Sequence, residues 1–142
     1  MKLKFVKLDP RAVLPKYAHA SDSGMDVYAL EDKFISARFN GKIRTGVAAV
    51  IPTGYELQVR PRSGLTFKKG IVGAFGTVDN GYRGEICIAL YNHTDEPFVV
   101  KAGDRVAQLV LAPVAHAEVV EASADELGET DRGAAGFGST GR

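Results

Sequence analysis

The sequence predicts an all-β fold, a jelly-roll-like β-sandwich or barrel with one short helix and a flexible, glycine-rich C-terminal arm. We count about ten short β-prone segments separated by Gly, Pro, Asn and Asp turn signals. The segment 55–60 alternates apolar with polar side chains, which is typical of a half-buried strand. Few windows have helical periodicity, and strands do not alternate with helices. These patterns favour an antiparallel sandwich over a parallel α/β sheet.

The expected strands follow one another at short intervals. Lysines alternate with apolar residues over 1–8, which predicts the first strand. A polar loop at 20–26 then leads into the second strand. The remaining segments expected to be β are 27–30, 34–35, 43–45, 47–51, 55–60, 71–72, 76–78, 86–92, 98–100, 106–111 and 119–120.

The exception to the β pattern is the segment 63–70. Ser63 can act as the N-cap of a short helix, and Gly70 can end it after one or two turns. Beyond the last expected strand, residues 123–131 are acidic and contain glycine, as in a linker. We therefore expect one β domain over 1–122, followed by a linker and arm over 123–142.

Composition excludes several classes of protein. The 142 residues are 45% hydrophobic and 25% charged, which is typical of an ordinary globular domain. A formal charge of +1 argues against stable nucleic-acid binding and against affinity for anionic membranes. With a single cysteine, Cys87, no intrachain disulfide can form, and no Cys/His cluster has zinc-site spacing. The N-terminus lacks the apolar run of a signal peptide or membrane span, so a cytoplasmic protein is the simplest expectation.

The segment 76–92 predicts a β-hairpin with chemistry at its tip. Asn80 and Gly81 tolerate the positive φ that tight hairpin turns require. Asp79, Tyr82 and Arg83 stand at the same bend and could line a pocket. Taken alone, the bend has a second interpretation as an ordinary Asp-Asn-Gly turn with a covering tyrosine and a solvated arginine.

A second cluster lies at the start of the short helix. A helix N-terminus presents unpaired N–H groups, Gly64 permits close approach, and Arg62 is a forked, permanently charged donor that suits phosphate. Together with Ser63 these residues could cradle a phosphate. A capped turn with a surface arginine is an equally good interpretation of the same segment.

The third cluster is the C-terminal tail, 132–142, in which four glycines stand between two arginines. It superficially resembles a phosphate-binding P-loop, but it lacks the lysine and ends where a helix should begin. An ordinary tail of this composition would be disordered. Arg132 and Phe137 suggest instead an arm that orders over a ligand, supplying phosphate donors and a stacking aromatic.

At this point the chain resembles the family of trimeric deoxyuridine triphosphate nucleotidohydrolases, the dUTPases. Five motifs that occur in the order typical of that family carry the resemblance, and together they span nearly the whole chain. They lie at 23–27, 61–65, 76–84, 103–109 and 132–141. Each motif alone is weak, but five in order are very specific, and they favour the functional interpretation of the hairpin tip.

The resemblance implies a homotrimer of jelly rolls whose three active sites are each built from all three subunits. The reaction would be hydrolysis of dUTP to dUMP and pyrophosphate, with Mg²⁺ on the triphosphate, which limits uracil in DNA and supplies dUMP for dTMP synthesis. By likeness Asp79 is the general base, and Tyr82 packs under the deoxyribose. A carboxylate of ordinary pKa, about 3.9, is ionised at neutral pH, so the chemistry permits that role.

The same resemblance assigns the remaining contacts. Uracil would be read by the backbone of 73–78, including Gly73, Gly76, Thr77 and Val78, and by the strand near Cys87. The phosphates would meet Arg62, Ser63, Gly64 and Gln108, while Asp26 would hold the hydration shell of the metal or support Asp79. Asp26 could equally be a strand-entry residue that caps its own loop. From the arm, Arg132, Ser139 and Thr140 would contact the β- and γ-phosphates, and Phe137 with Gly138 would close over uracil.

One departure from the family pattern concerns uracil recognition. Gly73 stands where many family members have an asparagine that contacts uracil, so base recognition here would depend more on backbone.

Three alternative functions stay open. A dCTP deaminase or bifunctional deaminase-dUTPase typically has Arg-Ser-Ser in the second motif and a tryptophan beside the turn, and this chain has neither. A non-catalytic nucleotide-binding jelly roll would not need Asp79, and a structural jelly roll would leave the tail unexplained.

Overall fold

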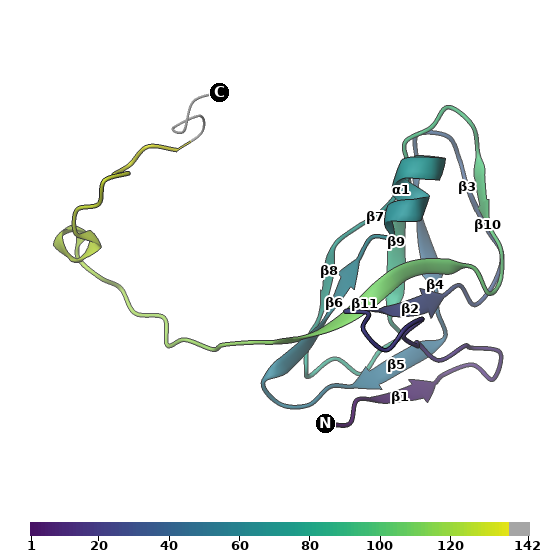
Figure 1. Ribbon diagram of the computed structural model, residues 1–142, viewed down its shortest axis with the longest axis horizontal. Coiled ribbons are helices and arrows are strands. Elements are labelled where there is room, and N and C mark those ends of the chain that lie inside the picture. The colour runs from purple at the N-terminus through teal and green to yellow at the C-terminus, as the bar shows by residue number, and fades with distance from the viewer. Residues whose placement is uncertain (137–142) are drawn as a thin grey trace.

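The computed structural model describes residues 1–136, and its body is a β-sandwich from which the C-terminal segment extends (Figure 1). The helical elements are α1 (Ser63–Lys69) and a 3-10 turn, η1 (Ala124–Leu127). The strands are β1 (Lys4–Lys7), β2 (Met25–Tyr28), β3 (Lys33–Ile35), β4 (Asn40–Arg44), β5 (Val47–Val50), β6 (Tyr55–Arg60), β7 (Ile71–Gly73), β8 (Gly76–Val78), β9 (Cys87–Asn92), β10 (Phe98–Val100) and β11 (Arg105–Pro113). The predicted all-β class with one short helix is confirmed.

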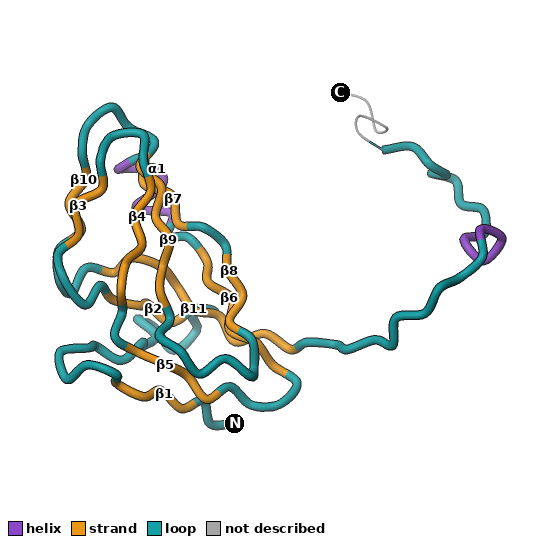
Figure 2. The backbone as a smooth tube through the Cα atoms, turned by 180° about the vertical axis from the view of Figure 1, so that it is seen from behind, coloured by secondary structure: helices purple, strands orange, loops and turns teal. Residues whose placement is uncertain are grey.

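The strands form two larger sheets and two ribbons, all of them antiparallel (Figure 2). One sheet has the order β2-β11-β6-β8, and the other has the order β4-β9-β7. The ribbons are β1-β5 and β10-β3. Strand β8 is therefore an edge strand, and its outer backbone groups are not used by the ladder with β6.

The core lies between the two larger sheets. Its side chains come from alternate positions of both, as the half-buried strand pattern predicts, and they include Val27, Ile43, Leu57, Ile88 and Leu109, each at most 1% exposed. Burial of these branched side chains contributes roughly 1.5–3 kcal/mol each to folding. The core thereby fixes the two sheets relative to one another.

The chain beyond β11 differs from expectation. Val119 and Val120 were predicted to form a last strand, but they lie in an extended segment, and Val119 is 95% exposed. Their β propensity has no partner strand to act on within the described residues, so the prediction is wrong. The segment 123–131 contains η1 at its start, where the Ser123 hydroxyl and the Glu126 carboxylate form a capping box.

The short helix is confirmed, but its cap is not the predicted one. Arg62 occupies the N-cap position with an extended backbone, no side chain caps the helix, and Ser63 is the first helical residue. Gly70 ends the helix as predicted, with a left-handed φ of 64°.

The hairpin predicted over 76–92 is wrong, because β8 does not pair with β9. Strands β7 and β9 pair as far as Gly73 opposite Leu90, and the Ala74 N–H then donates to the Ala89 carbonyl at 2.9 Å. Beyond that point β8 leaves β9 and joins β6 in the other sheet, with Thr77 opposite Gln58. The two arms of the hairpin therefore separate before they reach the turn.

The turn itself is also of a different kind from the one expected. The Tyr82 N–H donates to the Asp79 carbonyl at 3.0 Å, which closes a four-residue turn. Within residues 1–136, Asn80 and Gly81 are not among the residues of positive φ. A mirror-image hairpin turn is not needed here because the flanking strands are no longer paired.

No helix in the part of the chain described by the structure is long and apolar enough to cross a membrane.

Candidate active site

The separation of β8 from β9 opens a pocket of about 280 Å³. The residues of β8 line one wall, and Cys87 at the start of β9 lines another. Asp79 and Tyr82 line it from the turn that joins the two walls. The structure thus brings together most of the residues predicted to read uracil and deoxyribose, namely Gly76, Thr77, Val78, Tyr82 and Cys87, with the predicted base Asp79.

The turn that carries Asp79 is braced by three hydrogen bonds. The Asn80 amide donates to the Ile51 carbonyl on the neighbouring loop. Arg83 folds back and donates from Nη1 to the carbonyls of Asn80 and Tyr82, at 2.7 and 2.9 Å. These bonds occupy Arg83 and hold the backbone of the turn, while the Asp79 side chain stays exposed at the pocket. A carboxylate on a turn held in this way can orient a water molecule.

Gly73 belongs to the same region but is not part of the pocket wall. It is buried, and a Cβ at this position would come within 3.3 Å of the Pro61 backbone. Any side chain here would have to push β7 away from the segment that precedes α1. Close packing of the β7 backbone against the backbone of Pro61 therefore explains why residue 73 is a glycine. The next strand, β8, supplies the residues that line the pocket.

Two charged or ionisable groups in the pocket have shifted pKa values. Partial burial alone would raise the pKa of Glu85, but hydrogen bonds from the Gly46 N–H and from Arg44 lower it overall. Burial is the main cause of the raised pKa of the Cys87 thiol, and the negative charge of Glu85 adds to it. At neutral pH this wall of the pocket therefore presents a protonated thiol beside an ionised, hydrogen-bonded carboxylate.

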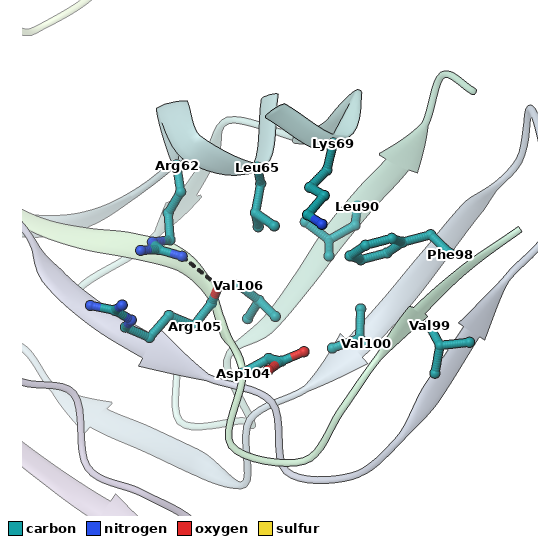
Figure 3. A pocket seen from close by; sticks show the side chains of 10 residues that line it. All are labelled: Arg62, Leu65, Lys69, Leu90, Phe98, Val99, Val100, Asp104, Arg105 and Val106. Atoms are coloured by element: carbon teal, nitrogen blue, oxygen red, sulfur yellow. Dashed lines mark hydrogen bonds between the residues drawn. The ribbon is translucent and has the colours of Figure 1, made fainter. Parts of the chain in front are cut away.

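Arg62 lines a second pocket, which is distinct from the pocket of Asp79. Arg62 lines this pocket of about 400 Å³ with Lys69 from α1 and Arg105 from β11 (Figure 3). Its Nη1 donates to the Arg105 carbonyl at 3.0 Å, and its Nε lies 3.4 Å from Oδ1 of Asp26. The residues that line this pocket and those that line the Asp79 pocket have no member in common.

Gln108 belongs to the region of Arg62. Across the four-stranded sheet, Gln108 on β11 stands opposite Asp26 on β2 and opposite Arg60 on β6. The predicted helix-start residues Ser63 and Gly64 follow Arg62 and are exposed, and a Cβ on Gly64 would meet nothing within 4 Å. The predicted phosphate donors thus gather at one place, which is separate from the pocket of Asp79.

The surroundings of Asp26 do not suit a metal ion. Its side chain is 6% exposed, and its two oxygens face the guanidinium groups of Arg62 and Arg105 at 3.4 and 3.3 Å. A divalent cation, even a hydrated one, would have to displace one of these positive charges. Within residues 1–136, no group of three or more His, Cys, Asp or Glu side chains is close enough to hold a metal ion.

The predicted arm residues are mostly outside the description. Phe137, Gly138, Ser139 and Thr140 lie beyond residue 136. Arg132 is exposed, and its Nε donates to the Ala135 carbonyl at 2.9 Å within the arm itself.

Sequence reasoning did not single out three residues of these clusters. Lys42 from β4 and Glu85 line the pocket of Asp79, and Arg105 flanks Asp26. Arg105 stands in the fourth motif, beside the predicted Gln108, so its position could have suggested a role. Lys42 carries no local signal, because only the pairing of β4 with β9, which sets it opposite Ala89, brings it to this pocket.

Known proteins resemble the chain along nearly its whole length. The family model described as dUTPase matches residues 11–141. Deoxyuridine 5'-triphosphate nucleotidohydrolases from Picosynechococcus sp. and Nautilia profundicola are each 48% identical to the chain; the alignments cover 99% of both chains and 100% of both chains, respectively. The dUTPase of Staphylococcus bacteriophage 80alpha, solved with dUPNHPP, superimposes with a TM-score of 0.92 at 27% identity over 99% of each chain. The chain belongs to the dUTPase family.

Proposed function

We propose that this protein hydrolyses dUTP to dUMP and pyrophosphate, the reaction for which its relatives are named. Asp79 orients a water molecule and takes its proton, the water oxygen bonds to the α-phosphorus, and the bond from that phosphorus to the bridging oxygen breaks to release pyrophosphate. The observation that carries the proposal is the exposed carboxylate of Asp79, which stands on a braced turn at a pocket lined by β8. A carboxylate in the right position contributes through geometry as well as through basicity.

Base selection follows from the wall made by β8. Because β8 is an edge strand, its outer N–H and C=O groups can pair with the edge of a base. Fixed donors and acceptors that match uracil would meet cytosine donor against donor. Each buried group left unpaired costs roughly 1–3 kcal/mol, which favours dUTP over dCTP by about tenfold or more.

We infer that the complete site requires a second copy of the chain. The phosphate donor Arg62 lines one pocket and Asp79 lines another, and the two pockets have no lining residue in common. A homotrimer, which the family resemblance implies, would bring the Arg62 cluster of one subunit to the Asp79 pocket of another. Arg132 and the arm residues that follow would then close over the triphosphate.

We infer that Mg²⁺ enters with the triphosphate and is not held by a protein cage. A relative, the D95N mutant dUTPase of phage phi11, is described as coordinating a structural Mg(II) ion; it superimposes with a TM-score of 0.83 at 26% identity and covers 89% of this chain. Bound to phosphate oxygens, the ion would neutralise negative charge. The surroundings of Asp26 argue against that residue as a ligand of the ion.

The direct test is pyrophosphate release from dUTP, dCTP, dTTP and UTP, measured in parallel with Mg²⁺. We expect rapid turnover of dUTP alone, and its collapse in a truncation ending at Asp131. Release of ammonia from dCTP would instead indicate a deaminase. Tight binding of dUTP without turnover would indicate a nucleotide-binding module.

Shared sites can be tested by mixing two inactive variants. Asp79→Asn lacks the base and Arg62→Ala lacks the phosphate donor, so each homotrimer should be inactive. After subunit exchange, mixed trimers contain sites in which an intact Asp79 meets an intact Arg62 from another chain. Recovery of dUTPase activity on mixing supports the shared site, whereas no recovery despite proven exchange would place both residues in one subunit.

A further inference from the structure

Asp26 is a buried carboxylate whose position is fixed from both sides. Strand β2 pairs with β11 along one edge, where Asp26 stands opposite Gln108. On the other edge Asp26 and Lys16 exchange two backbone hydrogen bonds, at 2.9 and 3.3 Å. Its neighbours Met25 and Val27 point into the core, so the Asp26 side chain lies on the opposite face of the sheet. The carboxylate therefore has little freedom to move.

Two arginines from different elements converge on this carboxylate. Nη1 of Arg105, on β11, donates to Oδ2 at 3.3 Å. Nε of Arg62, at the start of α1, lies 3.4 Å from Oδ1, but without hydrogen-bond geometry. Within residues 1–136, Oδ1 is a buried oxygen that accepts no hydrogen bond. Figure 3 shows the two guanidinium groups close together at one end of the pocket.

Arg62 is held at two points of its guanidinium group. Nε faces Asp26, and Nη1 donates to the Arg105 carbonyl. The Nη2 amino group is the remaining donor group of the fork. A guanidinium oriented in this way can offer Nη2 to an anion without first losing side-chain freedom.

The charge balance of the cluster shows which ligand it favours. One carboxylate between two guanidinium groups leaves a net charge of +1, which attracts a phosphate oxygen and repels a divalent cation. Without the carboxylate, two like charges would face each other and separate. The buried carboxylate, in turn, needs both arginines to offset its desolvation.

We propose that Asp26 is a positioning residue that presets Arg62 and Arg105 as a pair for the substrate phosphates, and that it is not part of the hydration shell of the metal. This inference rests on the proposed function and adds Arg105 to the residues that donate to the phosphates. If Asp26 acts through Arg62, loss of either side chain should weaken substrate binding by the same route, and the two losses should not add.

The first measurement uses the full-length protein without ligand. The Nε–H signal of Arg62, assigned by its loss in Arg62→Lys, is followed by ¹H–¹⁵N NMR in the wild type and in Asp26→Asn. We expect this signal to shift and its hydrogen exchange to accelerate in Asp26→Asn. An unchanged signal would overturn the proposal, whatever the protein does to dUTP.

The second measurement is the affinity for dUPNHPP by calorimetry, with and without Mg²⁺. Loss of a charge-assisted contact should weaken binding roughly 10- to 100-fold in Asp26→Asn and in Arg62→Lys. The double variant should be about as weak as the weaker single variant, because both remove the same unit. Additive losses would overturn the proposal, and so would an Asp26→Asn defect seen only with Mg²⁺ and removed by more Mg²⁺.

Two further variants keep the test decisive. Arg105→Gln changes a half-exposed side chain, so it tests the same pair if Asp26→Asn fails to fold; it should also weaken analogue binding. Asp95→Asn breaks an exposed ion pair with Arg38 and should leave affinity unchanged. A wild type that neither turns over dUTP nor binds the analogue would refute the proposed function. A wild type that does both, with unchanged affinity in Asp26→Asn and Arg105→Gln, would refute this inference alone.

Discussion

The phenol of Tyr82 donates a hydrogen bond to the backbone carbonyl of Glu85 at 3.0 Å, and its ring lies over Gly84. A Cβ at Gly84 would collide with the phenol oxygen and the ring carbon that carries it. The absence of a side chain at residue 84 therefore decides where the tyrosine lies against the pocket.

Gly84→Ala should displace the Tyr82 ring and reduce discrimination against UTP. A ring that packs under the deoxyribose, as the family resemblance implies for Tyr82, leaves no room for a 2′-hydroxyl, and a shifted ring would no longer exclude it. We expect the ratio of kcat/KM for dUTP over UTP to fall roughly tenfold or more. Gly81→Ala is the matched control from the same turn, because its Cβ would meet nothing within 4 Å. An equal ratio in both variants would contradict this role of Gly84.

Asp79→Asn should abolish turnover while sparing affinity. The amide keeps the shape of the carboxylate but cannot accept the proton of water, so kcat should fall roughly 10²- to 10⁴-fold. Binding of dUPNHPP should change little, since the change concerns the transition state. Asp32→Asn, at an exposed pair with Lys101, serves as control. A variant that retains wild-type kcat would exclude Asp79 as the base.

Glu85→Gln should destabilise the fold at neutral pH, and the difference from wild type should shrink in acid. Glu85 accepts from the Gly46 N–H at 2.8 Å and from Arg44 at 3.1 Å, which lowers its pKa below the usual 4.5 despite partial burial. A carboxyl with a lowered pKa in the folded state stabilises the protein above its unfolded pKa and loses this contribution as pH falls through the folded value. The free energy of unfolding should therefore drop by about 1–2 kcal/mol at pH 7.

Urea unfolding at pH 7, 5 and 3.5 measures this effect. The gap between wild type and Glu85→Gln should be similar at pH 7 and 5 and smaller at pH 3.5. The control is Glu96→Gln, because among the described residues the Glu96 carboxylate enters no ion pair. A gap that does not depend on pH would mean that packing, and not ionisation, accounts for the effect.

Cys87 should react slowly with thiol reagents, and nucleotide should slow it further. Burial raises the pKa of the thiol, so the reactive thiolate is scarce at neutral pH. The labelling rate should keep rising with pH through 9, the usual value for a thiol. Because this is the one cysteine of the chain, Cys87→Ser gives the blank. Labelling that dUMP does not affect would exclude the pocket as its binding site.

The sequence predicted the local features of the site and missed the long-range ones. Asp79 and Tyr82 stand in one turn, and Gly70 ends a helix, so neighbours along the chain revealed them. The exchange of partners by β8 depends on β6, a strand that local patterns do not connect with the turn. The contact of Asp26 with Arg105 spans 79 residues and has no local signal. The strand predicted at Val119 and Val120 was wrong for the opposite reason: β propensity is a local property, but a strand also needs a partner strand.

The separation of β8 from β9 also has a consequence for engineering. The two walls of the pocket belong to different sheets, so its width depends on how far apart the sheets pack. That spacing is set by core side chains such as Leu57 on β6 and Ile43 on β4, neither of which lines the pocket. Resized core residues should therefore admit pyrimidines with bulkier 5-substituents while every group that contacts the base is left untouched.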